Sequence, residues 1–260
     1  MKYVILSFDD GRLDTYDNAY KIISKYKLSA TMNIVSDFIQ NQHHYDIFRS
    51  AGNKAMTPAQ LIECQQYGIE IACHGATHKN TVEDILRNIE ELSAMGICTE
   101  NIGFASPYSV LTEQNCSKIK EIKDKSIIYY IRSGLQIKRE GLLYMLLSYI
   151  ERRSHSKVLY YYLNKRNIIR DNSHTILKSA AVTKYTSFSQ LKYFIERMKN
   201  NEAIIFMFHS ILDKKSPYVN SDEWYWDKQR FEELCKYLRE SDSISVITTK
   251  ELVMQLTAEF

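Results

Sequence analysis

The sequence lacks the cysteine pattern of a disulfide framework or of a structural zinc site. Its cysteines are five, an odd number, and no two of them stand in a C-x-x-C spacing. Disulfide-rich secreted domains and zinc ribbons both depend on such paired spacings. We therefore expect reduced, mostly packed thiols at all five positions: Cys64, Cys73, Cys98, Cys116 and Cys235.

Long apolar runs are also absent. No stretch approaches the roughly 18 apolar residues of a membrane-spanning helix. The apolar stretch near the N-terminus, Tyr3–Phe8, is too short for a signal peptide and has no small-residue cleavage site. The sequence therefore predicts a cytoplasmic protein, unless a leader has been removed.

The chain has no large excess of charge of one sign, since 34 Lys or Arg face 31 Asp or Glu. Nothing in this balance calls for nucleic acid as a partner. With 45% apolar and 25% charged residues, the 260 residues suit one folded catalytic domain, 1–260.

One segment, 118–170, departs from this balance with thirteen Lys or Arg against four Asp or Glu. A solvated helical surface is the interpretation we favour for such a charge run. A lid, an oligomer contact, or a surface that meets a membrane or a lipid-linked glycan are the alternatives.

Short apolar runs alternate with longer amphipathic stretches along the chain, and successive apolar positions favour strands buried on both faces of a parallel sheet. The alternation predicts an α/β fold, a closed or nearly closed parallel barrel. The predicted strands are Tyr3–Phe8, Thr31–Val35, Ile69–Cys73, Ile102–Phe104, Ile127–Ile131, Ile204–Phe208 and Ser245–Ile247. The predicted helices are Asp14–Tyr26, Thr57–Tyr67, Val82–Met95, Phe188–Asn200 and Asp227–Arg239.

The segment 140–167 breaks this rhythm with two Leu- and Tyr-rich stretches. We interpret it as an inserted helical pair outside the barrel.

Polar clusters follow four of the predicted strands: Asp9-Asp10-Gly11, His74 to His78, Pro107-Tyr108 and His209. Parallel α/β barrels build their active sites at the carboxyl ends of the strands. A single polar residue at a strand end is commonly structural, but four segments that converge on one rim indicate a site.

Two histidines four residues apart, His74 and His78, can present both imidazoles to one ion, and a carboxylate from another strand end completes a facial set with open positions. Asp9 and Asp10 would point to opposite faces of a regular strand, but both can turn toward the barrel mouth where the strand runs into Gly11. One can then bind metal while the other accepts a proton. A glycosidase pair fits less well, because its carboxylates need about 5 Å or more between them.

Three further residues are candidates at the same rim. His209 follows the most apolar strand and could protonate a departing amine. Trp224 and Trp226 lie in a polar, aromatic loop and could stack on a sugar, although one or both could instead pack on the following helix.

These motifs resemble those of the polysaccharide deacetylases, also called the NodB-homology or carbohydrate esterase family 4. Ser7–Gly11 resembles the [ST]-F-D-D-G motif, His74–His78 the H-[ST]-x-x-H motif, Phe104–Ser109 the R-x-P-Y segment, and Phe208-His209 the L-x-H segment. The resemblance covers nearly the whole chain except the segment 140–167.

The resemblance implies a distorted (β/α)7 barrel in which Asp9 is the catalytic base and His209 the general acid. The backbone amide of Tyr108 would stabilise the oxyanion, and Pro107 and Tyr108 would contact the substrate. It also implies one divalent ion, zinc first and cobalt or nickel as alternatives, held by three ligands: Asp10, His74 and His78.

The sequence departs from the family pattern in three motifs. It has no clear D-x-x-D-W motif, and Asp171 is the nearest candidate for a carboxylate that would orient His209. Ala105 stands where the family has the arginine that orients the base, and Gly75 replaces the usual Ser or Thr. The expected activity is removal of an N-acetyl group from an amino sugar or glycan precursor. A non-catalytic relative that binds glycan, and an amidase acting on a non-sugar C–N amide, are the alternatives.

Overall fold

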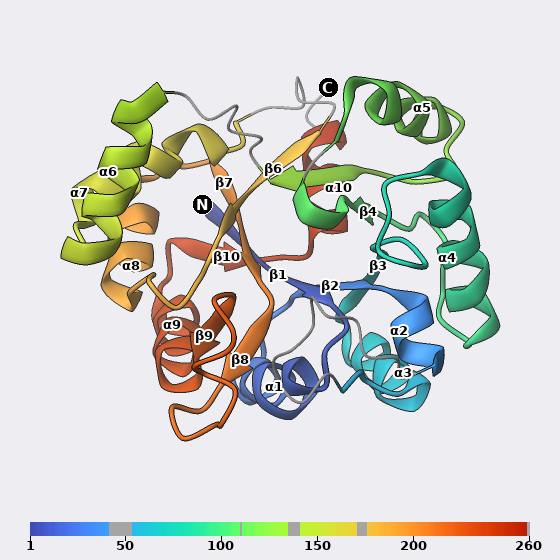
Figure 1. Cartoon of the computed structure of the whole chain (residues 1–260), viewed down its shortest axis with the longest axis horizontal. Helices are drawn as coiled ribbons and strands as arrows, with labels where there is room; N and C mark the ends of the chain where they lie inside the picture. Colours follow the sequence, from blue (N-terminus) through green and yellow to red (C-terminus); the bar gives the residue numbers. More distant parts are fainter. Residues whose placement is uncertain (42–53, 110, 135–140, 171–175, 259–260) are drawn as a thin grey trace.

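The computed structural model describes residues 1–41, 54–109, 111–134, 141–170 and 176–258. Seven parallel strands close into a barrel, because β1 pairs with β2 on one side and with β7 on the other. Helices surround it (Figure 1). The barrel strands are β1 Lys2–Asp10, β2 Thr31–Ile34, β3 Glu70–Cys73, β4 Phe104–Ala105, β5 Ile131–Gly134, β6 Leu177–Ala181 and β7 Ala203–Phe208. The predicted distorted (β/α)7 barrel is confirmed.

Two of the seven predicted strands differ from those of the barrel. Ile127–Ile131 overlaps β5 only at Ile131, because the strand begins four residues later than predicted. Ser245–Ile247 was predicted as a barrel strand and β6 was missed, since its Leu-Lys-Ser-Ala-Ala run has no β-branched residue. The terminal strand, β10 (Ile244–Val246), pairs only with the start of β1, at Lys2–Val4, before β2 begins to pair. It is therefore an addition beside the closed ring.

Residues of β1 alternate between two apolar clusters. Val4, Leu6 and Phe8 pack in the large cluster that includes helical side chains, whereas Ile5 packs with β7 residues in a smaller cluster. Because side chains alternate along a strand, Asp9 lies on the same side of β1 as Ile5, toward the barrel interior.

The helices begin where their sequence signals predict. Thr57 accepts a hydrogen bond from the Gln60 backbone N–H at 3.3 Å, and the Gln60 side chain accepts one from the Thr57 N–H at 2.8 Å. Pro58 occupies the first turn of α3, as predicted. The helices are α1 Lys21–Lys25, α2 Ser36–Asn41, α3 Pro58–Tyr67, α4 Val82–Ala94, α5 Glu113–Asp124, α6 Gly141–Ser154, α7 Lys157–Asn164, α8 Phe188–Arg197, α9 Lys228–Glu240 and α10 Thr249–Ala258.

The helix predicted at Asp14–Tyr26 begins as a π-helix, Thr15–Tyr20, before α1. This turn contacts β8 (Ser210–Leu212), which pairs with β9 (Tyr225–Asp227). The Asp14 carboxylate accepts a hydrogen bond from the Ile211 backbone N–H at 2.8 Å. Burial raises the pKa of this carboxyl to about 7. The first helix is thereby tied to the chain that follows β7.

The segment predicted as an inserted helical pair contains α6 and α7, which lie at the periphery beside α8 (Figure 1). Tyr160 of α7 is buried, and its ring lies 6.2 Å from that of Phe194 in α8. None of the described helices is long and apolar enough to cross a membrane.

Candidate active site at the carboxyl ends of the strands

Asp9 and Asp10 end β1, and the backbone there explains how adjacent carboxylates serve one site. Asp10 has φ of 83°, in the left-handed region that L-residues rarely adopt. This turn breaks the alternation of the strand, so both side chains lie at the barrel mouth. His78 and Tyr108, which line the same pocket, also have positive φ. Such strain clusters at functional sites.

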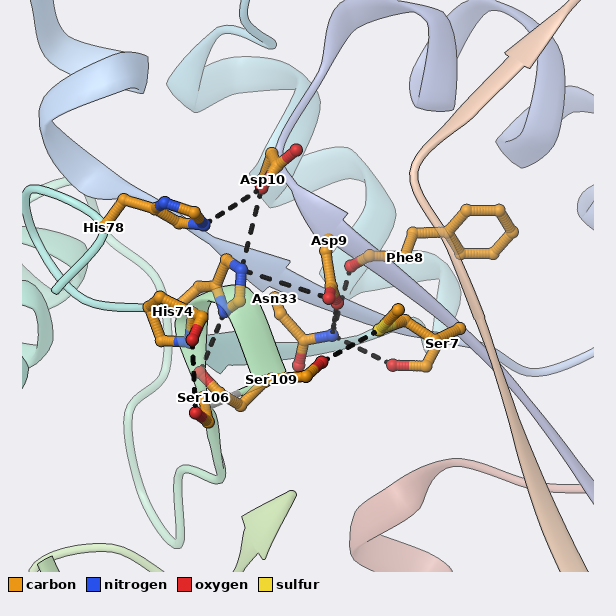
Figure 2. A network of polar contacts seen from close by, with 12 residues as sticks. Ser7, Phe8, Asp9, Asp10, Asn33, His74, His78, Ser106 and Ser109 are labelled. Atoms are coloured by element: carbon orange, nitrogen blue, oxygen red, sulfur yellow. Dashed lines mark hydrogen bonds and ion pairs between the residues drawn. The ribbon is translucent and has the colours of Figure 1, made fainter. Parts of the chain in front are cut away.

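Asp10, His74 and His78 form a buried cluster whose ligand atoms all lie within 4.8 Å of one another. The Oδ1 atom of Asp10 lies 3.6 Å from the Nε2 atom of each histidine. Two ligands about 2.1 Å from one tetrahedral ion are about 3.4 Å apart. Figure 2 shows both imidazoles directed at the Asp10 carboxylate. The three residues therefore fit a single divalent ion.

The protonation of the two histidines also suits a metal. The His74 Nδ1 atom lies 2.8 Å from the Ala105 carbonyl oxygen, a contact that favours a proton on Nδ1 and leaves Nε2 to bind an ion. Burial, with the neighbouring His74 ring, lowers the pKa of His78 to about 3. A neutral imidazole is the form that binds metal.

The turn between the two histidines explains Gly75. Its φ is 78°, and an added Cβ would lie 2.7 Å from both the Lys79 carbonyl oxygen and the Asp84 carboxylate. That carboxylate accepts hydrogen bonds from the backbone N–H groups of Thr77 and Lys79. A Ser or Thr side chain would collide with the groups that hold His78 in place.

Asp9 is held by Arg132, a residue that the sequence analysis did not identify. The Nη2 atom of Arg132 donates to both carboxylate oxygens of Asp9, at 2.7 and 2.8 Å, and Asn33 donates to Oδ1 at 2.7 Å. Burial opposes the charge on Asp9, but Arg132, His74 and His209 outweigh it and lower its pKa. Asp9 is therefore ionised and available to accept a proton at neutral pH.

Arg132 supplies the guanidinium that the sequence lacks at Ala105. Ala105 on β4 and Arg132 on β5 are direct partners in the sheet register. The guanidinium reaches Asp9 from the neighbouring strand, and the small Ser179 of β6 accepts a hydrogen bond from its Nη1 atom at 3.2 Å. The signal was present in the sequence, because Arg132 directly follows the predicted strand Ile127–Ile131.

A second buried arginine, Arg12, was also missed. Its Nε atom donates to the Oδ2 atom of Asp10 at 2.8 Å, on the opposite oxygen from the one that faces the histidines. Its Nη1 atom donates to Ser210 at 2.9 Å and lies 3.4 Å from the Asp222 carboxylate. Asp222 in turn accepts from the Trp224 backbone N–H. Arg12 thus links the Asp10 carboxylate to the loop that carries Trp224.

His209 lines the same pocket as Asp9, Asp10 and His74. Burial lowers its pKa, whereas Asp10 and Asp9 act in the opposite direction. No described residue hydrogen-bonds its Nδ1 atom. Asp171, which the sequence suggested as its orienting carboxylate, lies outside the described residues.

The structure separates the two residues predicted to contact substrate after β4. Tyr108 lines the pocket, is 64% exposed, and places its ring 4.5 Å from that of His78. Pro107 is buried and is not among the residues that line the pocket, so its contact with substrate stays a prediction. Its carbonyl oxygen instead accepts a hydrogen bond from the Asn80 side chain at 2.9 Å.

The two tryptophans also differ. Trp224 lines the pocket with its ring 5.0 Å from that of His209. Trp226 is fully buried, packs against Phe208 and Phe231, and donates from Nε1 to the Thr186 carbonyl at 2.7 Å. In a regular strand, residues two apart point to the same side, so Trp224 and Trp226 would share a face. Trp224 instead lies in the loop before β9, and only Trp226 points into the core. Trp226 is therefore no sugar contact; it packs on the following helix.

This difference gives a matched pair of substitutions. We expect Trp226→Ala to lower the free energy of unfolding by about 3–5 kcal/mol, because it leaves a cavity in the core. Trp224→Ala should change stability little and raise KM by about two- to tenfold through the lost aromatic face. Denaturant unfolding and steady-state kinetics on both variants measure this. Equal loss of stability in both would contradict the assignment.

The pocket itself has a volume of about 590 Å³. Beyond Asp10, His74 and His78 it is lined by residues of the inserted helices, including Tyr144, Ser148 and Glu151 of α6 and Tyr160 of α7. Glu151 is buried and accepts a hydrogen bond from the Gln190 side chain of α8. The segment interpreted as outside the barrel therefore also forms one wall of the site.

The fold and the site together define a class: parallel α/β barrels with two histidines and a carboxylate clustered at the carboxyl ends of the strands. Within that class, residues 1–123 match the family model described as polysaccharide deacetylase. The resemblance of this chain to the polysaccharide deacetylase family is thereby confirmed.

A curated relative is YxkH of Bacillus subtilis (strain 168), whose name describes it as a polysaccharide deacetylase. It is 34% identical over 77 residues, which are 30% of this chain and 24% of YxkH. The match thus spans about a quarter of that relative.

Solved structures of similar fold cover nearly all of the chain. A family 4 acetyl xylan esterase from Clostridium thermocellum, solved with a cobalt ion, has a TM-score of 0.52 at 14% identity, covering 97% of this chain and 91% of its own. The peptidoglycan deacetylase PdaC from Bacillus subtilis has a TM-score of 0.51 at 14% identity, covering 99% and 92%. At such identities the likeness shows the fold alone.

Proposed function

We propose that this protein is a metal-dependent hydrolase that removes an N-acetyl group from an amino sugar or glycan precursor. One observation carries the proposal. Three residues that could hold a metal ion line the same pocket as a further carboxylate, Asp9, which Arg132 binds through both oxygens. The family match of residues 1–123 supports the same reaction.

The metal would be held by Asp10, His74 and His78, with zinc as our first choice and cobalt or nickel as alternatives. When bound, such an ion polarises an amide carbonyl and lowers the pKa of water. Three protein ligands leave coordination positions open, as this chemistry requires.

The protein's own residues then divide the proton transfers. Asp9, ionised beside Arg132, accepts the proton of the attacking water. The backbone N–H of Tyr108 would stabilise the charge that develops on the amide oxygen. His209 donates a proton to the departing amine, so that the C–N bond breaks to give acetate and a free amino sugar. Trp224 and Tyr108 offer aromatic surface to the sugar.

Arg132 also weighs on the alternatives. The lack of an arginine at Ala105 favoured the alternative of a non-catalytic relative. Arg132 on β5 binds the Asp9 carboxylate instead, so this argument for a non-catalytic relative no longer applies. An amidase for a non-sugar substrate would use the same machinery and remains the alternative function.

Acetate release from a panel of N-acetylhexosamine oligomers and precursors tests the proposal. The protein is first stripped with a chelator and then supplied with zinc, cobalt or nickel. We expect release only with added metal. Metal binding without hydrolysis of any N-acetylated sugar, but with hydrolysis of a non-sugar amide, would favour the alternative.

His209 should act as the general acid, which must be protonated to work. We expect His209→Ala to lower turnover by about 10²- to 10⁴-fold while metal content stays constant. Because its pKa lies below the usual value, turnover of the parent should fall as pH rises through that lowered pKa, and this falling limb should vanish in the variant.

The exposed His155, outside the pocket, gives the matched control, and His155→Ala should behave as the parent. A loss below about tenfold in His209→Ala would assign the proton to another group or to water.

A further inference from the structure

Helix α6 carries its apolar residues on the side that faces solvent. Leu142 is 86% exposed and Leu143 68%, and the remaining members of this surface are at least 40% exposed. Surface helices normally turn their apolar stripe to the core and their polar residues to water. We call this surface the outer face of α6; it consists of Leu142, Leu143, Met145, Leu146, Tyr149 and Ile150.

The polar side of the same helix faces inward. Tyr144, Ser148 and Glu151 line the active-site pocket. At 100° per residue these three positions lie opposite the outer face. Helix α6 therefore turns its polar side to the pocket and its apolar side to solvent, and burial of apolar surface against the described residues does not account for this orientation.

Exposed basic residues lie on α6, on α7, which packs beside it, and on the turn that follows α7. They are Arg153, Lys157 and Lys165. The Arg153 guanidinium lies 5.2 Å from the centre of the Tyr149 ring, and the Lys165 amine lies 4.6 Å from that of Tyr162 in α7. The acidic residue of these two helices, Glu151, is buried on the opposite side. The exposed charge of α6, α7 and the turn that follows is thus positive.

This charge selects among the surfaces that could cover the outer face. In a symmetric pair of chains the same patch would meet itself and bring like charges together. An anionic bilayer surface offers apolar depth and complementary charge, and an amphipathic helix with Leu and Tyr on one side and Lys or Arg beside them is suited to that interface.

We propose that the outer face of α6 binds an anionic phospholipid surface. With 14 residues α6 is too short to cross a bilayer, so it lies in the plane of the headgroups. The pocket lies on the other side of the helix, within about one helix diameter, roughly 10 Å, of the lipid. The enzyme would then work on substrate held at a membrane surface.

Co-sedimentation of the full chain with vesicles tests the proposal without any turnover. We expect binding to vesicles of phosphatidylglycerol and phosphatidylcholine, weakened by high salt, and little binding to phosphatidylcholine alone. Leu142→Ser with Leu146→Ser should lower the partition coefficient by about tenfold or more. Lys157→Gln and Lys165→Gln should each lower it by about fivefold.

Matched controls come from other exposed positions. Met254→Ser on α10, 42% exposed in the parent, and Lys236→Gln on α9 should bind vesicles as the parent does. Circular dichroism confirms that each variant is folded. Absence of binding to anionic vesicles at low salt, or binding that the α6 variants leave unchanged, overturns the proposal. The protein could instead form a dimer without binding vesicles. If Leu142→Ser with Leu146→Ser then converts that dimer to a monomer, the outer face of α6 binds a second copy of the chain and the proposal is overturned.

Discussion

We expect Asp9→Asn to keep its metal while turnover falls by about 10²-fold or more. The amide preserves the shape of the side chain but cannot accept the proton of the attacking water. Asp9 contributes no atom to the cluster of Asp10, His74 and His78, so the ion should stay in place.

Asp10→Ala should fail in a different way. It removes one of three protein ligands, so metal content after dialysis should fall sharply, and activity should return only in part at high metal concentration. It also leaves Arg12 without the carboxylate that its Nε atom contacts at 2.8 Å.

Metal analysis and acetate release on both purified variants measure the difference. The two carboxylates are expected to have different roles because their partners differ. Arg132 binds Asp9, whereas His74 and His78 face Asp10. Equal metal loss in both variants, or full activity in Asp9→Asn, would overturn this division of labour.

Arg132→Met should also lower turnover at neutral pH by about 10²-fold, with metal content retained. Without the guanidinium, burial raises the pKa of Asp9 and favours its protonated form, which cannot act as a base. The ratio of variant turnover to parent turnover should therefore rise with pH, because both proteins share the falling limb of His209. Because one partner of a buried ion pair is removed, the free energy of unfolding should also fall by about 3–5 kcal/mol.

Two further variants separate a positioning role from a general loss of structure. Arg170→Met removes the pair between an exposed guanidinium and the buried Glu202, outside the pocket, and should leave turnover unchanged even where it lowers stability. Ala105→Arg combined with Arg132→Ala moves the guanidinium to the directly paired position on β4, where the family carries it. Recovery of at least part of the activity supports the positioning role; a pH profile for Arg132→Met identical to that of the parent contradicts it.

Much of the fold was predictable from local pattern. Runs such as Ile204–Phe208 are apolar at successive positions, as expected of strands that are covered on both faces. Thr57 followed by Pro58 is a typical start of a helix. The missed strand, β6, is Leu-Lys-Ser-Ala-Ala, whose small residues give no strand signal but leave room in the barrel for the Arg132 guanidinium.

The candidate metal ligands could be chosen from sequence because chemistry and spacing coincide there. His74 and His78 are four residues apart around a glycine turn, and Asp10 ends a buried strand. The partners of these residues could not be chosen in this way. Arg132 is 123 residues from Asp9, and Asp222 is 210 from Arg12, so only closure of the barrel brings these charges together.

The sequence by itself determined the parallel barrel, the rim that carries the polar residues and the candidate metal ligands, because each depends on local periodicity or on residue type. Tertiary structure alone decided which arginine holds Asp9, which tryptophan reaches the pocket and which side of α6 faces solvent. Those choices depend on contacts between segments far apart in the chain, and no local pattern records the direction in which a side chain finally points.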